Sequence, residues 1–316
     1  QNTIVRFDAD WTQVNPAGYL QSSIKPVEWL KLTAGLRYDH FFFENLNNHP
    51  STALPNEFTI SRDTGGFRPR GGIGITPVEG LTFFANAGQG ISAPVAGSDE
   101  GLLGNPGLRT AELTTFEVGF RYDTPNRLWN FGGAVYHTQL DGEVLFNPVT
   151  GQVENFGKSR REGFELEARY NIYQTEINRF SLYANFSMVR ARWLDRGPVT
   201  YITGVRDYTL TTGFEFDTNL FGENSNHLIR LAAYNQYFGP AALFGNPADA
   251  VGTDAFTETY HRVTAKISYT KRDWHNLTTF LTAVAYPASR IEETAFGGGV
   301  SAKPPVHVEG GIAFTF

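Results

Sequence analysis

The 316-residue sequence contains no cysteine and a single methionine. The lack of cysteine excludes a disulfide scaffold and any metal site built on thiolates. It also suits a protein that crosses an oxidising compartment before it folds. The seven histidines are scattered without an HxH or HxxxH pair, so we expect no bound metal.

Long apolar runs are also missing. None reaches the roughly 18 residues that a membrane-spanning helix needs, and the mean hydropathy is −0.29. A transmembrane β-barrel remains compatible with that value, because only alternate residues of each strand face lipid. The net charge of −6 argues against a nucleic-acid partner. The chain opens on Gln1 without a recognisable signal peptide, so we expect a processed protein or a piece of a longer one.

Motifs of enzymes are absent as well. The glycine-rich segments lack the spacing of a phosphate loop or a dinucleotide fingerprint, and no nucleophile elbow occurs. We therefore expect no catalytic residue, no cofactor and no enzymatic activity.

The C-terminal segment shows what the sequence does contain. Its apolar residues are Val306, Val308, Ile312, Phe314 and Phe316, with Gly310 interrupting the row. The residues between them are His307, Glu309, Gly311, Ala313 and Thr315. A period of two predicts a β-strand with one apolar and one mostly polar face.

The same alternation recurs in four further segments, which are 30–38, 116–123, 164–170 and 262–269. Each carries full charges on its second face, as Glu165, Glu167 and Arg169 do in the third. A charged face must meet water or ionic partners. The pattern favours an antiparallel transmembrane β-barrel over a soluble β-protein, which stays open as the alternative.

About fourteen strands are predicted, near residues 2–12, 17–25, 29–44, 66–76, 80–92, 113–123, 128–143, 161–172, 178–194, 205–217, 226–240, 256–270, 275–290 and 304–316. Short turns alternate with long polar loops, which are predicted near 45–65, 93–112, 144–160, 195–204, 241–255 and 291–303. This asymmetry is typical of outer-membrane barrels, with turns in the periplasm and loops outside the cell.

Aromatic residues gather at the short-turn ends of the predicted strands. They are Trp29, Trp129, Trp274, Tyr122, Tyr170, Tyr269 and Phe316. In the alternating scheme all seven fall at one level. We expect them to form an aromatic girdle at the periplasmic headgroups.

Several short motifs follow one another in a specific order. They are the segments 29–39, 67–72, 90–94, 105–108, 110–112, 116–122, 155–159 and 162–167. In this order and spacing the chain resembles the C-terminal part of a TonB-dependent outer-membrane receptor. The terminal residues Glu309, Gly311, Phe314 and Phe316 are similar to the signal by which the barrel-assembly machinery recognises such proteins.

The resemblance implies a twenty-two-stranded barrel that holds an N-terminal plug domain, preceded by a peptide that binds TonB. Residues 1–316 would be the C-terminal portion of the barrel, without the plug and the first strands. It further implies TonB-dependent active uptake of a scarce ligand, most often a ferric siderophore, across the outer membrane of a Gram-negative bacterium. The alternatives are a passive outer-membrane pore or structural barrel without a plug, an outer-membrane hydrolase, and a soluble β-rich domain.

Two glutamates are candidates for contact with the plug. Glu117 and Glu165 resemble the barrel glutamates that meet plug arginines in this family. A carboxylate that faces a filled lumen needs a cation, and arginine is the strong choice. The alternative is a pair within the barrel wall, with Arg121 or Arg169 as the partner.

Five inward-facing aromatic residues near the extracellular rim are candidates for ligand contact. By strand parity they are Phe41, Phe43, Trp193, Tyr234 and Tyr260. Such rings can hold an apolar or catecholate ligand. The alternative is ordinary packing at the rim, and a β-bulge would reverse the parity on which the choice rests.

Overall fold

The structure is a computed structural model that describes residues 9–47, 58–92, 107–147, 152–155, 157–195, 201–202, 204–242, 256–287, 292–294, 300–302 and 305–314. Within these ranges no helix is long and apolar enough to cross a membrane. The predicted all-β class is confirmed, since the elements of the described residues are strands.

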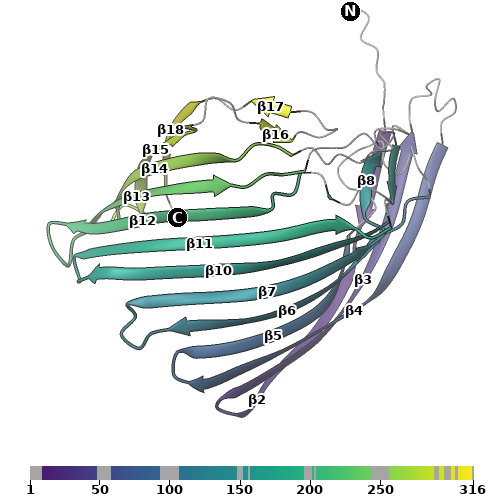
Figure 1. Ribbon diagram of the computed structural model, residues 1–316, viewed down its shortest axis with the longest axis horizontal. Coiled ribbons are helices and arrows are strands. Elements are labelled where there is room, and N and C mark those ends of the chain that lie inside the picture. The colour runs from purple at the N-terminus through teal and green to yellow at the C-terminus, as the bar shows by residue number, and fades with distance from the viewer. Residues whose placement is uncertain are drawn as a thin grey trace, which may run out of the picture.

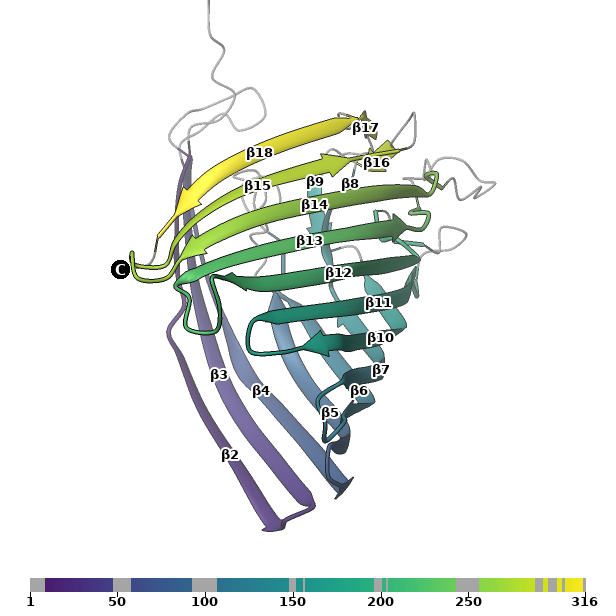
Figure 2. The same cartoon turned by 90° about the vertical axis from the view of Figure 1, so that its left-hand side faces the viewer.

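One antiparallel sheet of fourteen strands makes up most of the chain. Its strands are β1 (Ala9–Val14), β2 (Ala17–Val27), β3 (Leu30–Asn47), β4 (Phe58–Val78), β5 (Leu81–Ser92), β6 (Ala111–Asp123), β7 (Trp129–Asp141), β10 (Lys158–Gln174), β11 (Asn178–Trp193), β12 (Tyr208–Leu220), β13 (His227–Phe238), β14 (Tyr260–Lys271), β15 (Leu277–Ala285) and β18 (Val306–Ala313). From β3 onward, successive strands of this sheet pair with one another, and the sheet curves into an open partial barrel (Figures 1 and 2).

The strands β1 and β2 share one edge of the sheet. Both pair with β3, β1 along Phe42–Asn47 and β2 along Leu30–Asp39. Pro16 separates them because it has no N–H with which to continue the ladder. Its carbonyl oxygen accepts a hydrogen bond from the backbone N–H of His40 at 3.1 Å, which keeps the two strands in line.

Some predicted loops are wrong in extent. The predicted loop 45–65 is partly strand, because β3 runs to Asn47 and β4 begins at Phe58, where these two residues pair. The loops predicted at 144–160 and 291–303 contain the small hairpins β8 (Val144–Asn147)–β9 (Gln152–Asn155) and β16 (Glu292–Thr294)–β17 (Val300–Ala302). Beyond the apolar band both faces of a strand can be polar, so its residues do not alternate between apolar and polar. The polar segments were therefore predicted to be loops although they continue the strands.

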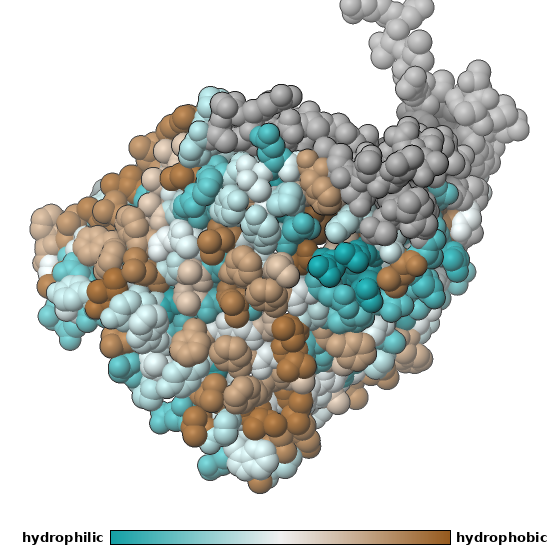
Figure 3. Space-filling model, viewed as in Figure 1, coloured by the Kyte–Doolittle hydropathy of each residue, from teal (hydrophilic) through white to brown (hydrophobic). Residues whose placement is uncertain are grey.

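The predicted apolar face is the convex face of the sheet. In β18 the side chains of Val306, Val308 and Ile312 are 60%, 58% and 69% exposed. Apolar side chains are spread across the convex surface (Figure 3), and no second sheet packs on it among the described residues. This exposure is the arrangement that a lipid-facing barrel wall requires.

The described part of the predicted girdle lies at the short-turn ends of the strands. The rings of Trp129 and Tyr170 stack with centroids 4.1 Å apart. The ammonium nitrogen of Lys271 lies 3.8 Å from the ring centroid of Trp274. Phe316 lies outside the described residues.

Candidate functional site

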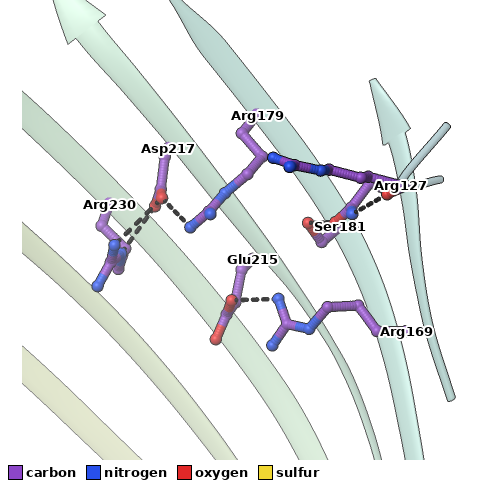
Figure 4. Close-up of polar contacts among 8 residues, drawn as sticks. Arg127, Arg169, Arg179, Ser181, Glu215, Asp217 and Arg230 are labelled. Carbon is purple, nitrogen blue, oxygen red and sulfur yellow. Dashed lines mark hydrogen bonds and ion pairs between the residues drawn. The ribbon is translucent and has the colours of Figure 1, made fainter. Parts of the chain in front are cut away.

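The concave face of the sheet carries a network of ion pairs near the short-turn ends (Figure 4). Asp217 on β12 accepts a hydrogen bond from Arg179 on β11 at 2.6 Å and another from Arg230 on β13 at 2.7 Å. Arg169 on β10 donates to Glu215 on β12 at 2.9 Å.

Strand register places these charges together. Glu215 and Asp217 are two residues apart on β12, so both side chains point to the same face. Asp217 pairs in register with Arg179 on one side and with Arg230 on the other. The opposite parity of β12 carries Phe214, whose ring is exposed on the convex side. The alternation of apolar and charged residues therefore sorts the two faces of the wall.

The two predicted plug-contact glutamates lie in one pocket of the concave wall. Glu117 of β6 and Glu165 of β10 line it together with Glu167 and Arg121, and its volume is about 540 Å³. Among the described residues none of the three glutamates forms an ion pair within 4.0 Å. The site is thus a concentration of negative charge on the concave wall.

The wall arginines have other partners. Arg121 lies 3.2 Å from a carboxylate oxygen of Asp123, and Arg169 lies 2.9 Å from Glu215. The pairing of Glu117 or Glu165 with these arginines, which the sequence left open, is therefore not present here. Contact of the two glutamates with a plug stays a prediction.

A group of arginines lies on the concave side of β3 and β4. Arg37 binds both carboxylate oxygens of the buried Asp39 at 2.9 Å. Arg68 pairs in register with Arg37 and lies 3.9 Å from Glu112, and its Nε is buried without a hydrogen-bond partner. Arg70 donates to the side chain of Gln21. The concave wall is thus basic on β3 and β4 and acidic from β6 to β10.

Two of the predicted ligand-contact residues are buried near the extracellular end of β3. The rings of Phe41 and Phe43 are parallel, with centroids 5.9 Å apart. Both pack against Leu108, with Ile91 and Val144 beside them. This cluster matches the packing alternative, and a contact with ligand stays a prediction.

The other three predicted residues lie on β11, β13 and β14. Trp193 is buried against Ala191 and Ile202. Tyr260 is also buried, and its ring stacks on that of Phe238 at 4.7 Å. Tyr234 is half-buried in the middle of β13. The structure does not bring all five predicted residues into one site.

Two arginines that the sequence analysis missed lie beside Tyr260. The guanidinium of Arg206 lies 4.8 Å from the ring centroid of Tyr260 and 5.7 Å from that of Phe238. The guanidinium of Arg262 lies 5.5 Å from the same Phe238 ring. Cations over aromatic faces are held by the ring quadrupole as well as by hydrogen bonds.

The hydrogen bonds of these two arginines go to neutral groups. Arg206 donates to the carbonyl oxygen of Gly239 at 2.7 Å, and Arg262 donates to Gln236 at 2.8 Å. In the described part of the chain neither has a carboxylate within ion-pair distance. Phe238, Tyr260, Arg206 and Arg262, which we call the rim cluster, therefore carry uncompensated positive charge.

The described part of the predicted assembly signal lies in and after β18. Glu309 lies 3.6 Å from His307 on the same face. Gly311 has no room for a side chain, because an added Cβ would come within 2.6 Å of the Phe280 ring. Phe314 is exposed, and Phe316 lies outside the described residues.

Most of the chain matches one known protein family. Residues 2–284 match the family described as TonB dependent receptor-like, beta-barrel. The chain belongs to this family. The family explains the open antiparallel sheet with an apolar convex face and a charged concave face as a part of a receptor barrel.

Sequence relatives and solved structures within this family agree with the assignment. The chain is 28% identical over 169 residues to the probable TonB-dependent siderophore receptor PiuA of Acinetobacter baumannii, a match that covers 51% of this chain and 22% of PiuA. The PiuA crystal structure superposes with a TM-score of 0.70 at 17% identity, covering 97% of this chain and 44% of that one. The ferric yersiniabactin uptake receptor FyuA of Yersinia pestis gives 0.68 at 13% identity, covering 96% and 45%.

These matches show the receptor-barrel fold. The chain spans less than half the length of the receptors that it matches. The chain therefore corresponds to a portion of the barrel of each receptor.

Proposed function

We propose that this chain is the C-terminal barrel portion of an outer-membrane receptor that takes up an iron chelate in a Gram-negative bacterium, energised through TonB. The observation that carries the proposal is membership of the receptor-barrel family over residues 2–284. A relative described as a siderophore receptor and a neighbour described as a ferric yersiniabactin uptake receptor support the ligand class. Residues 1–316 form one domain in this proposal, and no catalytic residue or cofactor takes part.

The edges of the sheet support the view that more strands complete the barrel. A strand edge that faces lipid leaves its N–H and C=O groups unpaired, at a cost of several kcal/mol for each group. The edge that β1 and β2 share and the edge at β18 are open among the described strands. We therefore propose that further strands of the full-length protein pair with both edges, and that Glu309, Gly311, Phe314 and Phe316 act in assembly.

The acidic pocket is the proposed contact with the plug. A carboxylate that is enclosed inside a barrel must be paired with a cation or it becomes destabilising. Glu117 and Glu165 have no ion pair with the described wall, so a cationic segment inside the barrel is the partner that they lack. Arginine side chains suit this position because they bind carboxylates through two parallel hydrogen bonds.

The rim cluster is the proposed site of ligand capture. Many iron chelates are anionic and carry aromatic catecholate groups, and Arg206 and Arg262 offer positive charge next to the rings of Phe238 and Tyr260. Of the five aromatic residues predicted from the sequence, Tyr260 is the one in contact with this charge. Phe41, Phe43, Trp193 and Tyr234 remain proposed contacts at other points of the wall.

A passive pore without a plug is the competing proposal, and the energy source separates the two. The test uses a strain in which the full-length gene is deleted and then restored, and it measures the entry of radioactive iron supplied as a panel of ferric chelates. We expect entry of at least one chelate to require both the gene and TonB. Entry that requires the gene but continues without TonB would support the pore instead.

A further inference from the structure

A boundary between apolar and charged residues crosses the convex face over β7, β10 and β11. Met188 of β11, Phe164 of β10 and Val135 of β7 form one row of paired residues. Two residues further toward the long-loop ends, the paired row is Arg190, Glu162 and His137. In the sheet these rows are about 7 Å apart, because each residue adds about 3.4 Å.

The side chains above the boundary point away from the concave wall. On β11 the residues at even positions share one face, and Leu182 and Met188 are exposed there. Arg190 and Arg192 continue the same face toward the extracellular end. Hydrophilic side chains gather toward the right-hand ends of β7 and β10 on this face (Figure 3).

The carboxylates of the neighbouring strands already have partners. Glu162 lies 3.1 Å from the ring nitrogen of His137 and 3.5 Å from the guanidinium of Arg160. Lys158 lies 3.3 Å from Asp141. Above the boundary on the convex face, these local pairs neutralise the charges of β7 and β10, whereas Arg190 and Arg192 of β11 stay charged.

Arg190 and Arg192 form no ion pair within 4.0 Å with any described residue. The Nε of Arg192 is buried without a hydrogen-bond partner. Its guanidinium lies 5.2 Å from the ring centroid of Tyr201, whose hydroxyl is 3.4 Å from Nη2. The ring thus holds the guanidinium in place while its donors remain available.

The acid that interacts with Arg190 is Asp207, which precedes β12. Burial raises the pKa of the Asp207 carboxyl above its usual value, and the charge of Arg190 opposes part of this rise. The interaction acts at a distance and does not involve a contact within ion-pair range in the described residues. Arg190 is exposed, so its guanidinium can reach a further anion.

We propose that Arg190 and Arg192 bind phosphate groups of the phosphorylated glycolipid in the outer leaflet. The inference rests on the proposed function, because it requires the convex face to lie in the outer membrane with the long loops outside. Guanidinium groups bind phosphate through paired hydrogen bonds, and headgroup phosphates lie just beyond the hydrocarbon, at the level of this row. Tyr201 completes the site by holding Arg192.

The test uses the full-length receptor in detergent and native mass spectrometry with two lipids. One is lipid A with both phosphates and the other is lipid A from which the phosphates have been removed. We expect the wild-type receptor to retain the phosphorylated lipid and to lose the dephosphorylated one. In the double variant Arg190→Gln/Arg192→Gln, retention of the phosphorylated lipid should fall at least about tenfold, which corresponds to about 1.4 kcal/mol.

The matched control is Arg127→Gln, which removes an arginine from a short turn at the opposite end of the wall. It should retain phosphorylated lipid as the wild type does. Equal retention by the double variant and the wild type, or equal retention of the two lipids, would overturn the inference. Electrophoretic mobility without heating shows that each variant is folded.

Uptake of iron chelate in cells separates this inference from the proposed function. The double variant lies outside the concave wall, so its uptake should equal that of the wild type. Normal uptake with no preference for phosphorylated lipid would reject the lipid site alone. A preference for phosphorylated lipid with no TonB-dependent uptake of any chelate would reject the proposed function alone.

Discussion

Arg169 on β10 and Glu215 on β12 are joined by a hydrogen bond of 2.9 Å although β11 lies between their strands. The side chains must together span two strand spacings, about 10 Å. Tyr183 of β11 lies beneath the bridge, with its ring centroid 5.5 Å from the Arg169 guanidinium. Because Arg169 is held by Glu215, it is not available to Glu165 on its own strand.

The first prediction concerns Asp217, which binds two arginines. We expect Asp217→Asn to lower the free energy of unfolding by about 1 to 2 kcal/mol, and Glu215→Gln, which frees one arginine, to lower it less. The cost stays below that of a fully buried pair because Arg179 and Arg230 are 42% and 49% exposed.

Guanidinium denaturation of the receptor in lipid vesicles measures this order. The control is Asp123→Asn, which breaks the exposed pair with Arg121 and should change the midpoint little. If Asp217→Asn lowers the denaturation midpoint no more than Asp123→Asn does, the network does not stabilise the wall.

The second prediction concerns the acidic pocket. In the full-length receptor the double substitution Glu117→Ala/Glu165→Ala should loosen the plug, since both carboxylates lose their proposed arginine partners. Cells should become several-fold more sensitive to a large antibiotic that the outer membrane normally excludes. Growth inhibition and chelate uptake are measured together.

The control for the pocket is Glu162→Ala, which removes a carboxylate from β10 on the convex face. It should leave antibiotic sensitivity unchanged. If the double variant behaves like this control in both leakage and uptake, the two glutamates do not hold a plug.

The third prediction concerns the rim cluster. Replacing Arg206 and Arg262 by glutamine should weaken the binding of an anionic ferric catecholate by about a hundredfold, because each of the two lost charge-assisted contacts costs about 1.4 kcal/mol, a factor of ten. Quenching of intrinsic fluorescence in the purified receptor measures the affinity. Arg272→Gln, in a short turn, is the matched control.

The charge of the ligand provides a second check. A neutral chelate of similar size should bind the wild type and the double variant with similar affinity, because it gains nothing from the two guanidinium charges. Unchanged affinity for the anionic chelate in the double variant would remove the rim cluster from the ligand site.

The fourth prediction concerns pH and two neighbouring short turns. A hydrogen bond with the Glu176 carboxyl raises the pKa of Glu223. Because this pKa is higher in the folded than in the unfolded protein, the hydrogen bond contributes its full stability at a pH below the pKa of the unfolded state. That stability is lost as the pH rises through the pKa of the folded state. The free energy of unfolding of the receptor should therefore fall slightly as the pH rises through the mildly acidic range.

Denaturation midpoints at several pH values check this dependence. Glu223→Gln keeps a hydrogen-bond donor in place and should remove the corresponding part of the pH dependence. The effect is small because the Glu223 side chain is at the surface and water screens it. Identical pH profiles for the wild type and Glu223→Gln would show that the two carboxyls do not interact.

The sequence predicted much of the wall because strand alternation is a local property. Residues two positions apart must share a face, so Val306, Val308 and Ile312 could be assigned to one apolar face directly. The same parity placed Glu117 and Glu165 on the concave side. Strand ends were less certain, because outside the apolar band any polar residue fits a strand or a loop.

Contacts between side chains on different strands could not be predicted from alternation along one strand. Arg206 and Arg262 are far apart in the chain, and they meet over Phe238 only because register brings β13 and β14 together below the 204–207 segment. The commitment of Arg169 to Glu215 likewise depends on the spacing across β11. No local signal in the sequence distinguishes this pair from a bond to Glu165.

By itself the sequence predicted the all-β class and, in the five segments that alternate, the two faces of the strand, because both follow from a repeat of two residues along one strand. Only the tertiary structure decided which charges are paired and which are left over. That outcome depends on register between neighbouring strands, where a shift of one residue exchanges the two faces. In the described part of the chain, the consequence is that the arginines above Met188 and the glutamates of the pocket form no ion pair.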